Sequence, residues 1–224
     1  MQRNISIAID GPAGAGKSTI AKIISKNMGI VYLDTGAMYR TVALKAVRDQ
    51  IDTTDRESLA KMVQDVDITV DYIDGEQSIY LNGEDVTSQI RTPEISIGAS
   101  NVAVVPEVRI KMVELQRQIA SKTSVVMDGR DIGTYVLPKA NFKFFLTASV
   151  EERALRRYNE QLAKGFKDIS LDSVKSDIEY RDKNDSSREF APLAKAADAI
   201  EVDTTSLSID EVAQRIVSII KENM

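Results

Sequence analysis

Residues 9–19 read IDGPAGAGKST, and this stretch constrains the fold more than any other part of the sequence. It contains Gly11-x-x-x-x-Gly16-Lys17-Ser18, the spacing of a phosphate-binding loop. An apolar run precedes it and an amphipathic stretch follows it, as a strand and a helix would. A glycine-rich turn with an exposed lysine is the alternative, but the flanking strand and helix favour a phosphate loop.

Each part of this loop has a chemical reason. Glycines let backbone N–H groups curl around a phosphate, and the following helix adds the positive end of its dipole. We expect Lys17 to bridge the β- and γ-phosphates of ATP and Ser18 to offer its hydroxyl to Mg²⁺. The residues expected to bind the triphosphate are Gly11, Pro12, Ala13, Gly14, Ala15, Gly16, Lys17, Ser18 and Thr19.

Strands and helices alternate along most of the chain. Short apolar runs predict buried strands at residues 5–9, 30–33, 124–127, 142–146 and 200–202. The first helical stripe consists of Ile20, Ile23, Ile24 and Met28, followed by Gly29 as a C-terminal cap. This order predicts an α/β fold, with a parallel sheet wrapped by helices.

Two later helices begin at the spacing of a capping box, Ser149 to Glu152 and Ser208 to Glu211. Their predicted apolar stripes are Val150, Ala154, Tyr158 and Leu162 in the first, and Val212, Ala213, Ile216 and Ile220 in the second.

Residues 68–86 break the alternation of strands and helices. They alternate polar with apolar side chains and contain Asp74-Gly75 and Asn82-Gly83, which are signals of tight hairpins. We expect a small antiparallel ribbon outside the parallel sheet, joined to helices near residues 57–65 and 94–120.

Composition excludes several classes of chemistry. The 224 residues include no histidine and no cysteine, so disulfides, thiolate nucleophiles and cysteine-ligated metals are excluded. A net charge of −5 argues against a nucleic acid polymer as partner. The apolar runs are too short to span a bilayer, so we expect a soluble, cytoplasmic chain with no membrane partner.

The missing histidine also bears on the reaction. An alcohol acceptor usually needs a general base, whereas a nucleoside monophosphate offers a phosphate oxygen that is already ionised near pH 7. Catalysis then requires positioning and positive charge around the transferred phosphoryl group.

Arginines supply that charge in three places. Arg153, Arg156 and Arg157 share one helix face, as do Arg181, Asp185 and Arg188, and Arg130 follows the strand that ends at Met127. A solvated helix face and an ordinary set of helix ion pairs are the alternatives for the first two groups. Asp128, at the end of a buried strand, is expected to meet Mg²⁺ through water.

Five separated blocks make the sequence more specific than its loop. They are IDGPAGAGKST, LDTGAMYR at 33–40, GASNVA at 98–103, MDGRDIG at 127–133 and RDKNDSSREFAPL at 181–193. In this order they closely resemble the bacterial cytidylate kinase family of P-loop nucleoside monophosphate kinases, which phosphorylate CMP and dCMP with ATP. The resemblance runs nearly from end to end of the chain.

The resemblance implies roles for particular residues. Arg40, Arg130 and Arg188 would grip the CMP phosphate. The cytosine site would be lined by Thr35, Ser100, Arg109 and Asp131, and Tyr39 would also bind CMP. A carboxylate facing the exocyclic amino group and an arginine facing the ring acceptors would read cytosine in complement. Arg181 and Asp185 would contact the sugar. Arg153 and Arg157 would belong to a lid over ATP. The expected catalytic residues are Lys17, Arg130, Arg153, Arg157 and Arg188.

The resemblance also implies a division of the chain. A single unit, residues 1–224, would comprise a core of residues 1–60 and 105–224, an NMP-binding insert at about 61–104 and a helical lid at about 150–168. We expect a monomer with ATP, CMP and dCMP as its partners and Mg²⁺ bound with ATP.

Two rivals remain open from the sequence. The same chemistry could use UMP, shikimate or dephospho-coenzyme A as acceptor. A nucleotide-dependent switch is a rival from another class, but guanine-binding switches carry N-K-x-D, and the nearest string here, at 182–185, begins with aspartate.

Overall fold

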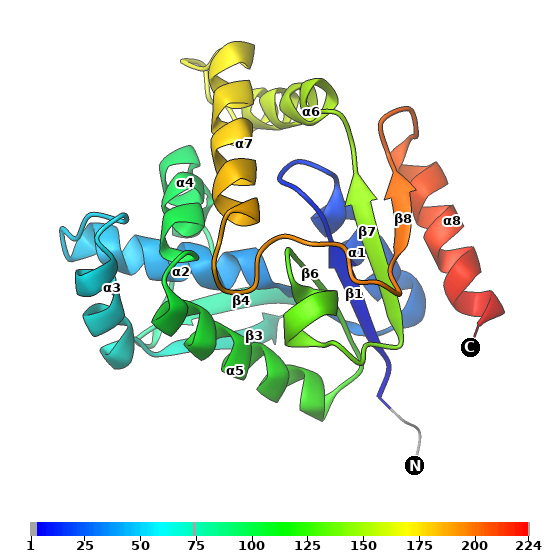
Figure 1. The fold of residues 1–224 in the computed structure, drawn as a ribbon, viewed down its shortest axis with the longest axis horizontal. Coiled ribbons are helices and arrows are strands. Elements are labelled where there is room, and N and C mark those ends of the chain that lie inside the picture. Colours follow the sequence, from blue (N-terminus) through cyan, green and yellow to red (C-terminus); the bar gives the residue numbers. More distant parts are fainter. Residues whose placement is uncertain (1–3, 74, 224) are drawn as a thin grey trace.

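A computed structural model describes residues 4–73 and 75–223 of the chain. Its centre is a five-stranded parallel sheet in the order β2-β6-β1-β7-β8 (Figure 1). The strands are β1 (Ser6–Asp10), β2 (Val31–Asp34), β6 (Val125–Gly129), β7 (Phe142–Thr147) and β8 (Ile200–Asp203). All five predicted strands are confirmed to within two residues at each end, and the α/β fold with them.

Helices cover both faces of this sheet because its strands are apolar on both sides. Ile7 and Ile9 of β1 pack in one cluster with α1 (Lys17–Met28) and α8 (Ile209–Glu222). Ala8 points the other way, into a cluster with α2 (Thr35–Arg48) and α5 (Pro106–Lys122). The predicted stripes of α1 and α8 lie in the first cluster.

The predicted ribbon is a separate three-stranded antiparallel sheet, β3-β4-β5. Its strands are β3 (Ile68–Ile73), β4 (Glu76–Leu81) and β5 (Glu84–Asp85). Asn82 and Gly83 both have positive φ, 50° and 84°, as a tight type I′ hairpin turn requires. The other predicted turn includes Asp74, which lies outside the described residues. Buried ribbon residues such as Ile79 share a cluster with Leu33 of β2.

Short helices connect the ribbon to the rest of the fold. They are α3 (Arg56–Met62), η1 (Val63–Asp65), η2 (Gln89–Arg91) and α4 (Pro93–Val102). The stretch expected to be helical at 94–120 is two helices, α4 and α5, rather than one. Pro106 has no N–H to continue a helix, and Val105 before it is extended, so α5 has to begin anew.

Two helices, α6 (Val150–Ala163) and α7 (Leu171–Ser186), stand above the end of the sheet at which β7 terminates (Figure 1). The predicted α6 stripe holds through Tyr158, which packs with Val174 and Ile178 of α7, but Leu162 is 43% exposed. The capping box of α6 is also only half present. Ser149 caps the Glu152 amide, yet the Glu152 carboxylate accepts from Arg156 instead. The box at Ser208 and Glu211 is complete.

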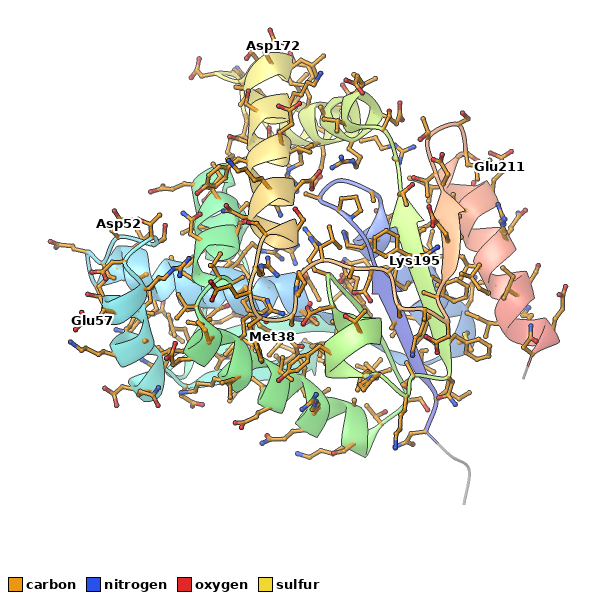
Figure 2. The ribbon with its side chains drawn as sticks, viewed as in Figure 1. Met38, Asp52, Glu57, Asp172, Lys195 and Glu211 are labelled. Carbon is orange, nitrogen blue, oxygen red and sulfur yellow. The ribbon has the colours of Figure 1, made fainter. Side chains whose placement is uncertain are left out.

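Side-chain placement agrees with this layering. Figure 2 shows Met38 in the interior, where it is fully buried, and Glu57, Asp172 and Glu211 at the outside. Each of these three acids lies in the first turn of a helix, where the helix dipole favours negative charge. In the described part of the chain, no helix is both long and apolar enough to cross a membrane.

The close approach of the phosphate loop to β7 gives a first prediction. A Cβ at Gly11 would lie 2.0 Å from the Leu146 carbonyl oxygen, and its φ is +145°. We therefore expect Gly11→Ala to lower the free energy of unfolding by about 3 kcal/mol in urea titrations. Gly165→Ala is the control, because its φ is also positive, +87°, but nothing lies within 4 Å of the added Cβ. Equal losses in the two variants would contradict the proposed clash.

Candidate active site

The phosphate loop lies between the end of β1 and the start of α1. Gly14 and Gly16 have positive φ, 78° and 86°, which turns the backbone at the loop apex. No side chain caps the N-terminus of α1, so its first amides are open to an anion. The Lys17 ammonium donates to the Pro12 carbonyl at 2.6 Å, and burial lowers the pKa of Lys17 well below its usual range.

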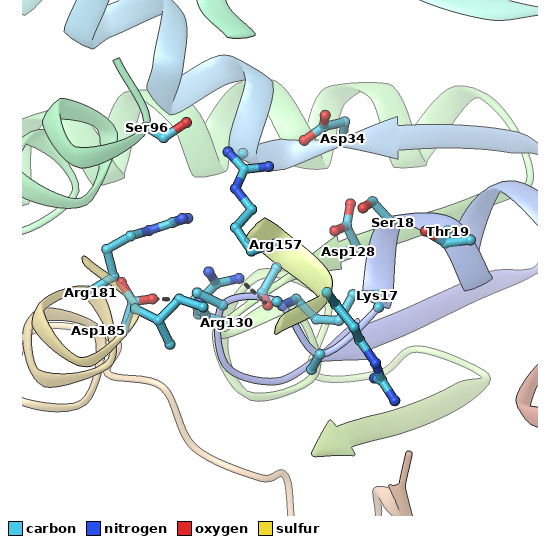
Figure 3. Close-up of a pocket in the computed structure, with 18 of the residues that line it drawn as sticks. Lys17, Ser18, Thr19, Asp34, Ser96, Asp128, Arg130, Arg157, Arg181 and Asp185 are labelled. Carbon is cyan, nitrogen blue, oxygen red and sulfur yellow. Dashed lines mark hydrogen bonds and ion pairs between the residues drawn. The ribbon is translucent and has the colours of Figure 1, made fainter. Parts of the chain in front are cut away.

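This loop forms one wall of a cavity of about 900 Å³. The other walls come from α2, α4, α5, α6, α7, the start of α8 with the segment before it, and the ends of β2 and β6. In Figure 3, Ser18 and Asp128 lie at one side of the cavity and Arg181 and Asp185 at the other, with Arg130 and Lys17 between them. A phosphate loop and a group of arginines therefore face each other across the cavity.

Asp128 and Ser18 are the residues that could hold a metal ion. Tyr32 donates to one Asp128 carboxylate oxygen at 2.9 Å. Burial raises the pKa of Asp128 to about 6, and the nearby charge of Asp34 acts in the same direction. The described residues contain no cluster of three acidic groups that would hold a metal unaided. A hydroxyl and one carboxylate fit Mg²⁺, which keeps waters and takes further oxygens from substrate phosphates.

Asp185 of α7 pairs with two arginines. Its carboxylate accepts from Arg130 Nε at 2.5 Å and also from Arg188. Burial alone would raise the pKa of Asp185, but the charges of Arg130 and Arg188 outweigh burial and hold it below its usual range. Arg181 and Asp185 share the predicted face of α7, but the helix ends at Ser186, so Arg188 follows the helix and does not lie on that face. All three residues line the cavity and are not an exposed set of helix ion pairs.

Several guanidinium donors near this pair have no partner among the described residues. The buried Nε–H groups of Arg40, Arg181 and Arg188 donate to no acceptor in the described residues, and the Ser100 hydroxyl makes no hydrogen bond there either. Burial and the charge of Arg130 lower the pKa of Arg181 to about 10. Buried donors normally have hydrogen-bond partners, so this group fits a bound anion.

Arg109 and Asp131 form a buried ion pair deeper in the cavity. The Arg109 guanidinium lies 5.6 Å from the centre of the Tyr39 ring. This arrangement presents a carboxylate, a cation and an aromatic face together. The Thr35 hydroxyl is also here, but it donates to the Asp128 carbonyl at 2.6 Å, so Thr35 holds the end of β6 as well as lining the cavity.

The three arginines predicted to share one face of α6 have different surroundings. Arg156 and Arg157 line the cavity, where Arg156 contacts Thr204 and Arg157 pairs with Glu160 at 2.9 Å. Arg153 is only 4% exposed and lies behind the phosphate loop, bonded to the Ala13 and Ala148 carbonyls and to Asp182.

Three acidic residues at the site were missed from the sequence. Asp10 accepts from the Ile132 and Gly133 amides at 2.8 and 2.7 Å and so fixes the loop that carries Arg130 and Asp131. Asp34 accepts from Arg40 at 2.8 Å. Asp182 contacts the phosphate loop. Their positions at strand ends are a signal for Asp10 and Asp34, whereas nothing local marks Asp182.

The fold has a counterpart among solved structures. An uncharacterized protein from Eubacterium ventriosum matches with a TM-score of 0.52 at 14% identity, covering 97% of this chain and 99% of that one. A likeness of this kind supports the fold alone.

Sequence comparison is more specific. The family profile described as "Cytidylate kinase" matches residues 7–222. A protein named cytidylate kinase from Bacillus cereus is 53% identical over 220 residues, covering 98% of this chain and 97% of the relative. One of the same name from Caldicellulosiruptor bescii is 49% identical over 217 residues, covering 97% and 96%. With a phosphate loop and an arginine cluster facing each other across one cavity, the chain belongs to the cytidylate kinase family.

Proposed function

We propose that this chain transfers the γ-phosphoryl group of ATP to CMP and dCMP, giving ADP with CDP or dCDP. The observation that carries the proposal is the cavity itself. A phosphate loop occupies one side, and arginines with unpartnered buried donors occupy the other, so two phosphorylated ligands can face each other.

The reaction is an in-line displacement. A phosphate oxygen of CMP attacks the γ-phosphorus, the bond from that phosphorus to the β-bridging oxygen breaks, and ADP carries away the bonding electrons. The attacking oxygen is already ionised near pH 7, so the transfer requires no general base. The chain has no histidine or cysteine, and we expect no covalent enzyme intermediate.

On the donor side, residues 11–19 hold the triphosphate with backbone amides, and Lys17 moves from the Pro12 carbonyl to the β- and γ-phosphates. Ser18 and, through water, Asp128 would hold Mg²⁺, which when bound neutralises charge on the phosphates. Arg157, which lines the cavity from α6, adds charge over the transferred group.

On the acceptor side, Arg40, Arg130 and Arg188 bind the CMP phosphate, and Arg181 with Asp185 contacts the sugar. Arg109 and Asp131 read the base edge, beside Thr35, Tyr39 and Ser100. The unpartnered Nε atoms and the buried Arg109–Asp131 pair support this division.

We assign Arg153 a different task from Arg157. Its guanidinium is buried behind the loop and already donates to two carbonyls and one carboxylate. It therefore acts by holding the loop rather than by touching a phosphate. We expect the protein to act as a monomer, and the cytoplasm, where ATP is plentiful, suits the reaction.

The identity of the acceptor can be tested by comparing the turnover of several candidate acceptors. Uracil places an acceptor where cytosine has its amino group, which leaves Asp131 opposite another acceptor. We expect kcat/KM for UMP to be about 10² to 10³ lower than for CMP in a coupled assay of ADP release. Shikimate, dephospho-coenzyme A and GTP without acceptor serve as further arms. Equal or better turnover of UMP would overturn the cytosine assignment, and acceptor-independent GTP hydrolysis would favour a switch.

The charge on Lys17 gives a second prediction. We expect Lys17→Met to lower kcat about 10² to 10³-fold while the protein stays folded by circular dichroism, because Lys17 neutralises charge that develops on the transferred group. Lys22→Met is the matched control on the same helix, since Lys22 is half exposed and pairs with Glu76. A kcat that falls equally in both variants would remove Lys17 from the catalytic set.

The environment of Asp128 gives a prediction in pH. Its carboxylate must be ionised to hold the waters of Mg²⁺, and its pKa is raised to about 6, so kcat/KM for ATP should fall as the pH drops through about 6. The Tyr32 hydrogen bond lowers this pKa. Tyr32→Phe removes that bond and should move the acid limb up by roughly half a pH unit.

ATP and CMP titrate in the same range, but their own titrations are identical for both proteins. The difference between the two profiles therefore reports the protein group alone. Superimposable acid limbs for the wild type and Tyr32→Phe would show that Asp128 does not control this step.

A further inference from the structure

Two side chains bind the backbone of the phosphate loop at a single residue, Ala13. The Ala13 N–H donates to one carboxylate oxygen of Asp182 at 3.2 Å. The Ala13 carbonyl accepts from Arg153 Nη1 at 2.9 Å, and the same Nη1 donates to the other Asp182 oxygen at 2.6 Å. The N–H and the carbonyl of Ala13 are thus both bound by two side chains, Arg153 of α6 and Asp182 of α7, which also bind each other. We call this three-way contact the grip.

We propose that Asp182 is a positioning residue of the donor site: with Arg153 it fixes the apex of the phosphate loop relative to α7, the helix that carries Arg181 and Asp185 and ends two residues before Arg188. The proposal rests on the proposed transfer of phosphate from ATP. It assigns a task to a residue of the string Asp-Lys-Asn-Asp at 182–185, which has no role as a guanine-binding motif.

The phosphate loop packs closely against α6. Ala13 is 2% exposed, and a Cβ at Gly14 would lie 3.1 Å from both the Cβ and the carbonyl oxygen of Arg153. The loop apex therefore rests directly on the α6 backbone. A shift of α6 or α7 moves the loop, and the loop cannot move toward α6.

Charge explains why the grip needs a carboxylate. The Arg153 side chain is 5% exposed, whereas that of Asp182 is 23% exposed. A buried guanidinium requires a charged partner, and Asp182 supplies it while also accepting from the loop. Without Asp182, the buried cation would face carbonyl groups only, and the Ala13 amide would lose its acceptor.

The grip matters most when a triphosphate is bound. In the structure, Lys17 also holds the loop through the Pro12 carbonyl, but it must leave that carbonyl to reach the phosphates. Within residues 4–73 and 75–223, Asp182 and Arg153 are then the side chains left bonded to the loop backbone. A loop with two left-handed glycines needs such a restraint to keep its amides in place.

The same grip sets the distance between donor and acceptor. Asp182 faces the loop from α7, and Arg181 and Asp185, next to it on that helix, face the acceptor side of the cavity. Fixing α7 to the loop therefore fixes the two phosphate-binding groups relative to each other. A misplacement of about 1 Å at this point can cost up to about 10²-fold in rate.

The test separates the loop from the acceptor site. We expect Asp182→Ala to weaken binding of inorganic tripolyphosphate and of ATP about tenfold by calorimetry, to raise KM for ATP and to lower kcat, with CMP binding in the absence of ATP unchanged. Asn184→Ala is the matched control, because Asn184 lies on the same helix but contacts Asn101 of α4 instead of the loop. It should leave all these values near wild type.

A second variant removes the unpaired charge. Arg153→Met/Asp182→Leu leaves no buried ion alone, so it should regain the thermal stability lost in Asp182→Ala. It should still bind tripolyphosphate and ATP about tenfold more weakly, because the grip on Ala13 is gone. Restored affinity in this double variant would overturn the proposal.

Other outcomes also decide against it. Tighter ATP binding in Asp182→Ala would make the carboxylate a competitor of the triphosphate, and an equal loss of CMP affinity would make it a general support of α7. A fall in thermal stability alone, with affinities intact, would leave only a structural role. Because tripolyphosphate binding needs no acceptor, this arm succeeds or fails independently of whether CMP is the substrate.

Discussion

Most guanidinium groups of the site are paired with a carboxylate before any substrate arrives, and this pairing shapes the whole site. Asp185 holds Arg130 and Arg188, Asp34 holds Arg40, Asp131 holds Arg109 and Asp182 holds Arg153. Removing one partner of a buried ion pair costs several kcal/mol, so each of these carboxylates keeps its arginine ordered in the empty cavity. The donors that remain unpartnered among the described residues, such as Nε of Arg40 and of Arg188, are then available to a phosphate without any rearrangement of the cluster.

The parallel sheet supplies the framework for these pairs. Every strand of the central sheet runs in the same direction, so the carboxyl ends of β1, β2 and β6 meet at one edge. Asp10, Asp34 and Asp128 stand at those ends, and their separations in sequence exceed twenty residues. Asp10 then fixes the chain after β6 by accepting two of its amides, which places Arg130 and Asp131 without contacting the cavity itself.

Local signals predicted the sheet and the phosphate loop, because periodicity, glycine placement and caps act over a few residues. The ribbon and its Asn82-Gly83 turn are confirmed for the same reason. The exceptions have long-range causes. The Glu152 carboxylate does not complete its predicted capping box because it pairs with Arg156, which is itself bonded to Thr204. Leu162 is exposed because the buried face of α6 continues through Gln161, which is 5% exposed and lies beside Val174 of α7. The contact between Asp182 and Ala13 spans 169 residues, so no spacing rule could find it.

Arg153 and Arg157 belong to the same helix but have different proposed roles at the site. Both belong to α6, four residues apart, and the sequence assigns them to one face. A full turn separates them along the helix axis, so Arg153 reaches under the loop at the helix base, where a buried cation can stabilise backbone carbonyls. Arg157 lies one turn further along, at the cavity, paired with Glu160, whose side chain is about half exposed. An ion pair near the surface is weak and can be exchanged for a phosphate, whereas a buried ion pair is costly to break. Because of this difference in burial, Arg157 can move with the reacting phosphoryl group, whereas Arg153 keeps the phosphate loop in place.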